Sequence, residues 1–165
     1  MIKNSLRSIL FSVGILMTIV SCNKSKQFEE EESRKIEEYL QNNSTINFEK
    51  KPSGLYYHEM VKGTGRVPVK FDTAFVKYTG KFLDGVIFDS NVSKTTSLEV
   101  LVGAPGLITG FAEGISYMAA GGKSLILVPS SLGYGSVGHY YGGISGYTPL
   151  LFEITLVQVK AGPGK

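Results

Sequence analysis

Alternating apolar and polar positions between residues 74 and 90 predict two strands joined by a tight turn. Ala74, Val76 and Tyr78 recur at every second position, which is the period of a strand with one buried face. Asp84 and Gly85 then separate two runs of bulky residues. Asp-Gly between such runs is a strong hairpin signal, because both residue types tolerate a positive φ. The chain is therefore expected to fold back on itself here.

Similar patterns predict further strands at 55–61, 97–102, 124–128 and 150–157. Pro68 argues against a central strand at the residues around it, because proline cannot donate a hydrogen bond to a neighbouring strand. The chain between 133 and 149 is rich in glycine and tyrosine and is expected to be a long loop.

One helix is predicted within this run of strands, over residues 109–120. Its apolar residues recur at helical spacing: Phe111, Ile115 and Met118. Glu113 is placed in its first turn, and Gly121 and Gly122 end it. Gly114 inside the helix suggests close packing on a sheet. Many strands with a single short helix favour the α+β class: an antiparallel sheet of about five strands wrapped around that helix.

The first 21 residues resemble a secretory leader. Lys3 and Arg7 precede an apolar run from 9 to 20, which is shorter than the roughly 20 residues that cross a bilayer as a helix. Ile19-Val20-Ser21-Cys22 resembles the lipobox of bacterial lipoproteins, in which the cysteine sulfur is acylated. We therefore expect residues 1–21 to be a lipoprotein signal peptide and Cys22 to anchor the protein to a membrane of the bacterial cell envelope, outside the cytoplasm. The alternatives are an ordinary signal peptide followed by an incidental cysteine, or an uncleaved anchor.

Residues 22–52 are polar and include four consecutive glutamates at 29–32. A narrow apolar stripe within this stretch predicts a short helix of about three turns. We interpret the stretch as a polar tether; an interaction or dimerisation segment is the alternative. Pro52-Ser53-Gly54 marks the boundary, and 53–165 is the expected globular domain.

Net charge gives no reason to expect a nucleic-acid partner. Loss of the leader lowers the formal charge from +3 to +1, because it removes Lys3 and Arg7 and no acidic residue. Cys22 is the single cysteine, so no disulfide forms within the chain. His58 and His139 have no partner at metal-ligand spacing, so neither a metal nor another cofactor is expected.

Three short motifs are weak matches to other chemistries. Residues 133–138 fit G-x-G-x-x-G but lack the strand and helix that dinucleotide binding needs. Gly122-Lys123-Ser124 lacks the earlier glycine of a phosphate-binding loop. Ser130, Ser131 or Ser136 with His139 and Asp89 supplies the residue types of a hydrolase triad, but none of these serines has a G-x-S-x-G surround.

Five aromatic residues fall at positions that can face one concave surface: Tyr78, Phe88, Phe111, Tyr134 and Phe152. An ordinary aromatic core is the alternative, and the pattern alone does not separate the two. Asp89 follows the apolar run of the hairpin, where burial of a carboxylate is costly unless donors satisfy it.

Three strings, in this order, resemble the FK506-binding protein (FKBP) family of peptidyl-prolyl cis-trans isomerases: VKYTGKFLDGVIFDS, GLITGFAEGISYMAAGGKSLILVPSSLGYG and GHYYGGISGYTPLLFEITLVQV. The resemblance runs from about Gly54 to Lys160 and includes the Y-T-G, F-D-S, P-x-x-L-x-Y-G and L-x-F-x-I-x-L motifs at family spacing. It implies an FKBP-like fold.

The resemblance also implies a shallow pocket formed by Tyr78, Phe88, Asp89, Leu107, Ile108, Tyr134, Ile144 and Phe152. Phe111 falls at the pocket floor, where the family often has tryptophan, and Leu98 falls where it often has phenylalanine. His139 matches a histidine at the pocket rim. The loop that follows is one residue longer than usual, and Ser145-Gly146 replaces the usual prolines, so substrate preference is expected to differ here.

By the same resemblance, the expected activity is cis-trans isomerisation of bonds preceding proline, in the folding of exported proteins. Tyr78, Asp89, Ile108 and Tyr134 are the expected catalytic residues: the Ile108 N–H and the Tyr134 hydroxyl donate to the substrate, and Asp89 accepts from Tyr78. Macrolides are a further candidate ligand class. A non-catalytic chaperone or binding module for proline-containing segments is the main alternative, and a structural lipoprotein with a vestigial pocket is another.

Overall fold

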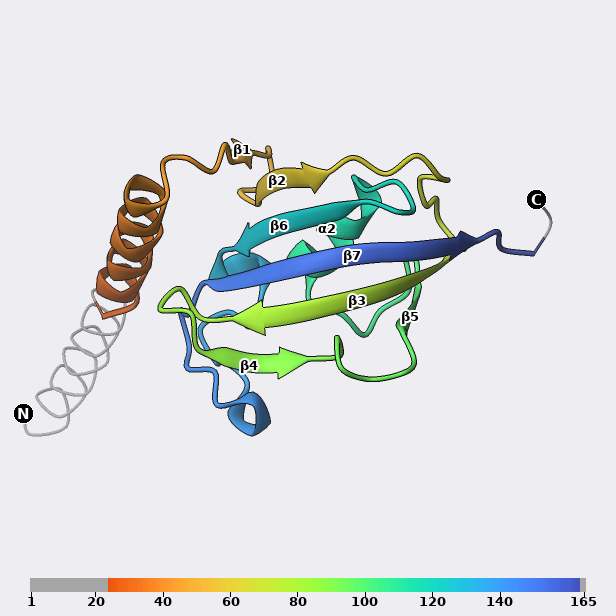
Figure 1. Cartoon of the computed structure of the whole chain (residues 1–165). Helices are drawn as coiled ribbons and strands as arrows, with labels where there is room; N and C mark the ends of the chain where they lie inside the picture. The colour runs from red at the N-terminus through yellow and green to blue at the C-terminus, as the bar shows by residue number, and fades with distance from the viewer. Residues whose placement is uncertain (1–23, 164–165) are drawn as a thin grey trace, which may run out of the picture.

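An antiparallel sheet of seven strands forms the centre of the molecule, in a computed structural model that describes residues 24–163 (Figure 1). The strands are β1 (Glu49–Lys50), β2 (Tyr56–Val61), β3 (Thr73–Lys81), β4 (Ile87–Ser90), β5 (Leu98–Leu101), β6 (Lys123–Val128) and β7 (Leu150–Lys160). Their order across the sheet is β1-β2-β6-β7-β3-β4, and β5 also pairs with β3. The predicted α+β class with an antiparallel sheet is confirmed.

The sheet has more strands than the sequence suggested, seven rather than about five. β1 was missed because its two residues are polar and exposed and carry no alternation. It pairs with β2 through Glu49 opposite Tyr57 and Lys50 opposite Tyr56.

The expected hairpin joins β3 to β4, with a turn of a different kind from the one predicted. Of the two turn residues, only Gly85 has a positive φ, 90°. The Asp84 carboxylate instead accepts a hydrogen bond from the Val86 N–H at 3.0 Å. The Phe82 N–H donates to the Val86 carbonyl at 2.9 Å, which closes the turn.

β6 is buried on both faces, which explains its continuous apolar run. Ile126 and Val128 face a core shared with the helix α2 (Thr109–Ser116), on one side of the sheet. Leu125 and Leu127 belong to a second apolar cluster on the other side.

The predicted helix over 109–120 is shorter in the structure, and α2 ends at Ser116. At its C-terminal end the backbone hydrogen bonds span three residues instead of four: the Tyr117 N–H donates to the Gly114 carbonyl at 3.3 Å. Glu113 therefore lies in the middle of α2, and no acidic residue occupies its first turn. Met118 is buried beyond the end of the helix.

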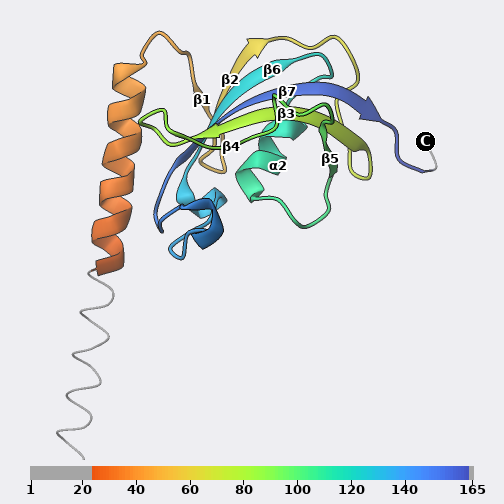
Figure 2. The same ribbon diagram turned by 60° about the horizontal axis from the view of Figure 1, so that its bottom comes forward.

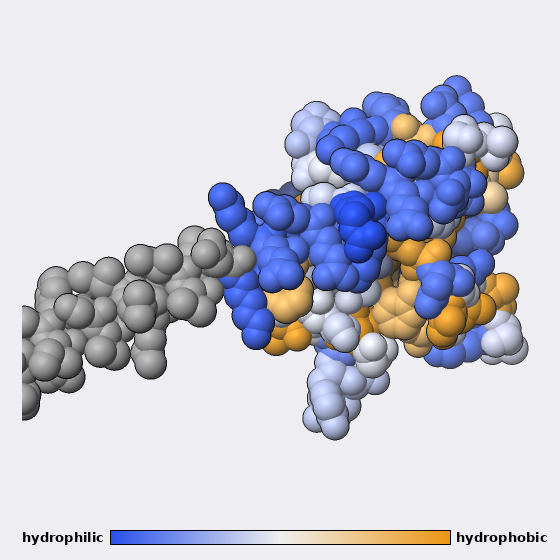
Figure 3. Space-filling model, turned by 90° about the vertical axis from the view of Figure 1, so that its left-hand side faces the viewer, coloured by the Kyte–Doolittle hydropathy of each residue, from blue (hydrophilic) through white to orange (hydrophobic). Residues whose placement is uncertain are grey.

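A second helix covers residues 24–42 and packs on the face of the sheet opposite α2 (Figures 1 and 2). Ile36 is buried in the cluster that holds Leu125, Leu127 and Leu151, at the end of the sheet where β6 finishes and β7 begins. The side of the molecule that carries this N-terminal helix is largely hydrophilic in the space-filling view (Figure 3).

From the sequence, residues 22–52 were expected to be a polar tether with a helix of about three turns. In the structure, residues 24–42 of this segment form a longer helix that is fixed to the domain, and β1 follows it. The spacing of its apolar residues was visible in the sequence, but their partners on β6 and β7 were not. Residues 1–21 and Cys22 lie outside the described residues. Within 24–163, no helix is both long and apolar enough to cross a membrane.

A buried carboxylate fixes the long loop before β3 to the C-terminal end of the chain. Asp72 is fully buried and accepts hydrogen bonds from Arg66 Nε at 2.9 Å, from the Val69 N–H at 3.1 Å and from the Gly162 N–H at 3.0 Å. The Arg66 guanidinium holds the pKa of the Asp72 carboxyl well below its usual range, against burial, which raises it.

Replacement of Gly114 by alanine is expected to destabilise the fold. A Cβ at Gly114 would lie 2.8 Å from Ile126 Cδ1, in a fully buried layer. Overpacking costs about 1–3 kcal/mol, and the better helix propensity of alanine returns at most about 1 kcal/mol. Urea unfolding should show a net loss of about 1–2 kcal/mol. Ser116→Ala, an exposed change in the same helix, is the control, and equal stability of the two variants would contradict the close packing.

The contribution of Asp72 to stability is expected to depend on pH. Because its pKa is lower in the folded chain than its ordinary value of 3.8, ionised Asp72 favours folding at neutral pH, and this advantage is lost as the pH falls below about 4. Unfolding measured at pH 7 and at pH 3 should show Asp72→Asn much less stable than the unchanged chain at pH 7, with a smaller difference at pH 3. Glu99→Gln, at an exposed position, is the control. A difference that stays constant between the two pH values would argue against an ionised Asp72.

Candidate functional site

A pocket of about 450 Å³ opens where β3, β4, β5, β7 and the start of α2 come together. Its lining comes from segments far apart in the sequence: Tyr78, Phe88, Asp89, Leu98, Gly106, Leu107, Ile108, Thr109, Phe111, Gly133, Tyr134, His139 and Phe152. Most of these side chains are apolar or aromatic, so the pocket suits a small apolar group.

Aromatic rings in edge-to-face contact form the floor. Phe111 and Phe152 are only 3% and 4% exposed, and their centroids lie 5.1 Å apart. Tyr78 meets Phe111 at 5.4 Å and Phe88 meets Phe152 at 5.6 Å. A Cβ at Gly80 would lie 2.6 Å from Phe88 and 2.9 Å from Phe152, so the missing side chain there is what allows the rings to close together.

Tyr78 and Asp89 face each other across the β3–β4 pair. The Tyr78 hydroxyl donates to Asp89 Oδ2 at 2.5 Å. Burial, then the hydrogen bond to Asp89 and its charge, raise the pKa of Tyr78, so the hydroxyl stays protonated at neutral pH. β4 lies at the edge of the sheet, so the Asp89 carboxylate is exposed at the pocket rim and does not bear the full cost of burial.

Tyr134 and His139 form the opposite rim. Their rings stack with centroids 4.8 Å apart, although His139 itself is exposed. Burial, and then the charge of Asp89, raise the pKa of Tyr134, so its hydroxyl also keeps its proton. Among the described residues, no group accepts a hydrogen bond from this hydroxyl, which leaves it available to a ligand.

A backbone donor lies among the residues that line the pocket. Ile108 is the N-cap residue of α2, and its carbonyl accepts hydrogen bonds from the Phe111 and Ala112 N–H groups. No acceptor among residues 24–163 receives the Ile108 N–H itself. Since the N-terminal end of a helix carries a partial positive charge, this N–H suits a carbonyl oxygen. The pocket therefore combines an apolar floor with two free donors, an arrangement that can hold an uncharged amide.

The structure brings ten of the eleven sequence-predicted pocket residues into this lining and leaves out Ile144. Ile144 is buried in the main core, and its backbone pairs with His139, so it supports the rim from below. Gly106, Thr109 and Gly133 also line the pocket and were not predicted. Each neighbours a predicted residue in the chain, which is the one sequence signal that could have identified them.

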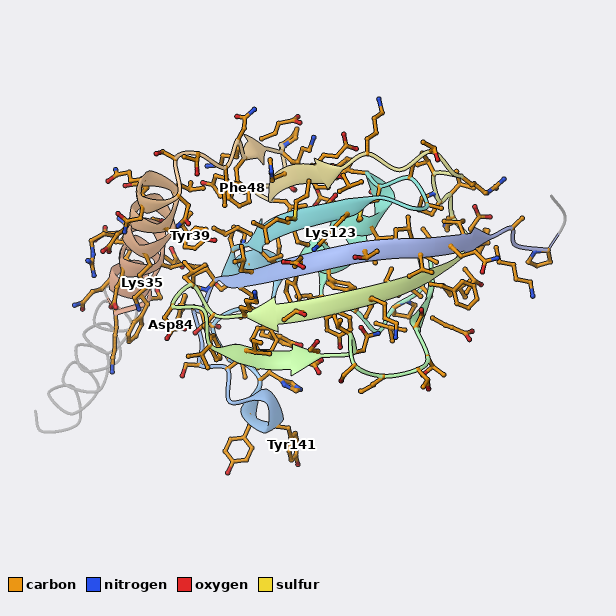
Figure 4. All side chains as sticks on the ribbon, viewed as in Figure 1. Lys35, Tyr39, Phe48, Asp84, Lys123 and Tyr141 are labelled. Carbon is orange, nitrogen blue, oxygen red and sulfur yellow. The ribbon has the colours of Figure 1, made fainter. Side chains whose placement is uncertain are left out.

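A larger hollow, of about 620 Å³, separates the N-terminal helix from the β3–β4 turn. Lys35 and Tyr39 of the helix and Asp84 of the turn lie along it (Figure 4). It has no floor of buried rings, and charged and amide side chains make up much of its wall, so the smaller pocket is the better candidate site. Within the described residues, no group of three or more His, Cys, Asp or Glu side chains is placed to hold a metal ion.

Comparisons with known proteins agree with the fold. The sequence pattern of the family described as FKBP-type peptidyl-prolyl cis-trans isomerase matches residues 65–157. The FK506-binding protein of Neisseria meningitidis serogroup B is 36% identical over 107 residues, which cover 64% of this chain and 96% of that protein.

Two further similarities differ in how much of each chain they cover. The outer membrane protein MIP of Legionella longbeachae is 40% identical over 113 residues, 66% of this chain and 46% of that protein. A peptidyl-prolyl cis-trans isomerase of Pseudomonas syringae has a crystal structure that superposes with a TM-score of 0.70 at 26% identity, over 82% of this chain and 96% of that one.

This chain spans half or less of the length of several curated relatives that it matches. The matched part nevertheless includes β3 to β6, α2 and most of β7, and hence all the elements that line the pocket. The family pattern matches more than half of this chain, and the Neisseria relative is covered almost end to end, so the family membership that the sequence suggested is established. The chain belongs to the FKBP-type peptidyl-prolyl cis-trans isomerase family.

Proposed function

We propose that the chain catalyses cis-trans isomerisation of the peptide bond before proline in polypeptide substrates. The observation that carries the proposal is the pocket itself: buried rings of Phe111 and Phe152 below, with the free Ile108 N–H and Tyr134 hydroxyl at its sides. Its size suits a prolyl ring and the amide that precedes it.

The chemistry requires no covalent step. Rotation about the C–N bond passes through a twisted amide that has lost its resonance, and the barrier is about 20 kcal/mol in water. The twisted amide is less polar than the planar one, so an apolar pocket favours it relative to the ground state. A site that excludes water and fixes the two ends of the bond therefore lowers the barrier.

The residues divide this work by position. The prolyl ring packs on Phe111, and the Ile108 N–H receives a substrate carbonyl oxygen. Tyr134 donates a second hydrogen bond, since its hydroxyl has no partner in the described chain. Asp89 accepts a hydrogen bond from the Tyr78 hydroxyl and so helps to keep the Tyr78 ring edge-to-face with Phe111. Phe88, Leu98, Leu107, His139 and Phe152 complete the substrate surface.

The same proposal includes a location. The leader-like residues 1–21 and the lipobox around Cys22 support export and lipid anchoring, with residues 53–165 as the isomerase domain and exported proteins as clients. The name of the Legionella relative places that protein in the outer membrane, which agrees with a location in the cell envelope. Macrolides are a further ligand class for the pocket, with Phe111 as its floor.

Loss of the Tyr134 hydroxyl should slow isomerisation. Tyr134→Phe removes one donor and breaks no bond within the described chain, so folding should be unchanged. One hydrogen bond contributes about 0.5–1.5 kcal/mol, which predicts a two- to tenfold fall in kcat/KM on short X-Pro peptides. Tyr141→Phe, on a ring that is 94% exposed and points away from the domain in Figure 4, is the matched control.

Two results would contradict these proposals. If the unchanged chain is folded and accelerates no X-Pro peptide, whatever the residue before proline, but still binds such peptides, the non-catalytic binding module replaces the isomerase. If Tyr134→Phe and Tyr141→Phe have the same rate as the unchanged chain, Tyr134 is not a donor to the substrate.

Acylation at Cys22 predicts a defined change in mass and location. In a bacterial host that processes lipoproteins, the mature chain should begin at Cys22, carry a diacylglyceryl group and sediment with membranes. Cys22→Ser should lose the lipid and leave the membrane fraction or retain its leader, whereas Ser21→Ala should behave as the unchanged chain. Intact-protein mass spectrometry distinguishes these products, and an unmodified Cys22 in the mature chain would exclude the anchor.

A further inference from the structure

A buried carboxylate joins the N-terminal helix to the loop that carries Tyr134. Glu32 is only 8% exposed, although its neighbours at 29–31 lie nearer to solvent. One of its oxygens accepts from the Ser130 N–H at 2.5 Å, and the other accepts from Ser130 Oγ at 2.6 Å. A carboxylate is costly to bury, and these two charge-assisted hydrogen bonds offset the cost. The proposed isomerisation itself makes no use of Glu32.

The contact satisfies a backbone group that the local sequence leaves unpaired. Ser130 opens the short 3-10 helix η1 (Ser130–Leu132), whose preceding residue, Pro129, provides no side-chain cap. The first N–H groups of a helix have no partner within it. Glu32, 98 residues away in the chain, supplies the cap instead.

Ser130 in turn holds the two residues on either side of Tyr134. Its carbonyl accepts hydrogen bonds from the Gly133 N–H at 2.9 Å and from the Gly135 N–H at 2.8 Å. Ser130 therefore contributes to the position of the Tyr134 backbone, and Glu32 contributes to the position of Ser130.

A second contact from the same helix reaches the same loop. The ring of Phe28 stacks on Tyr147, with centroids 5.4 Å apart and planes at 19°. The Tyr147 N–H donates to the Gly135 carbonyl at 2.9 Å. Tyr147 has φ 55°, a backbone conformation that is unfavourable for residues other than glycine. The stacking contact with Phe28 helps to stabilise this conformation. Phe28 and Glu32 lie four residues apart, on one side of the helix.

We infer that Glu32 is a positioning residue for the active site: through Ser130 it places Tyr134, so the N-terminal helix is part of the isomerase unit. The inference rests on the proposed function only in so far as Tyr134 acts on substrate. It assigns to residues 24–42 a role in turnover, in addition to any role in anchoring the protein.

The test compares Glu32→Ala, Glu32→Gln and Glu30→Ala in the full chain. Glutamine can keep both contacts, because its carbonyl oxygen accepts from the Ser130 N–H and its amide donates to Ser130 Oγ. Glu30→Ala removes an equal charge from an exposed position of the same helix and is the control. All four proteins are first compared by thermal unfolding, so that later measurements are made where each is folded.

Two measurements are then made on each protein. Amide hydrogen exchange at Gly133 and Gly135 reports whether the loop is held, and exchange should be roughly tenfold faster in Glu32→Ala alone. Displacement of a catalytic group by about 1 Å can cost up to about a hundredfold in rate, so we expect kcat/KM of Glu32→Ala to fall roughly tenfold. Glu32→Gln and Glu30→Ala should match the unchanged chain in both measurements.

A double variant separates positioning from a general loss of structure. If Glu32 acts through Tyr134, adding Tyr134→Phe to Glu32→Ala should cost little more than Glu32→Ala alone. A full additional loss would overturn the inference, as would unchanged exchange at Gly133 and Gly135 in Glu32→Ala. If the unchanged chain proves inactive, the proposed function fails, and the exchange data still decide whether Glu32 holds this loop.

Discussion

The close contact between α2 and β6 is the constraint on which the site depends. Two glycines of α2 allow it: a Cβ at Gly110 would lie 2.6 Å from Val128 Cγ1, and one at Gly114 would lie 2.8 Å from Ile126 Cδ1. Because interiors are close-packed, a helix held further from the sheet would carry Phe111 away from Phe152. The same approach fixes the Ile108 N–H at the pocket, so core packing and the placement of the donor have a single cause.

The sequence was most informative where a pattern repeats over one element. Alternation located β3 and β7, and Gly114 correctly indicated a helix lying tightly on a sheet. The sequence failed where the deciding partner is distant. The end of α2 at Ser116 depends on how the next turn tightens, and β1 exists only because β2 lies beside it. The helix over 24–42 showed its apolar stripe, but the leucines that cover Ile36 lie about 90 or more residues further along the chain.

The pocket residues could be predicted only through the resemblance to a known family, because residue spacing alone does not show which distant residues are in contact. Tyr78, Phe111 and Phe152 come from three separate elements, and no local rule brings their rings together. The apolar run before Asp89 does not reveal that its strand lies at the edge of the sheet, where the carboxylate is exposed to water. The Glu32–Ser130 pair was beyond sequence reasoning altogether, since one glutamate in a run of four has no distinguishing signal.

The docked helix also limits how far the domain can stand from a lipid surface. A free chain over residues 22–52 could extend on the order of 100 Å. With residues 24–42 helical and the helix packed on the sheet through Ile36, two peptide units separate Cys22 from the start of the described helix, a reach of roughly 7 Å. An acylated Cys22 would thus confine the pocket to a thin layer beside the membrane. The pocket would then meet polypeptides only by lateral diffusion within that layer.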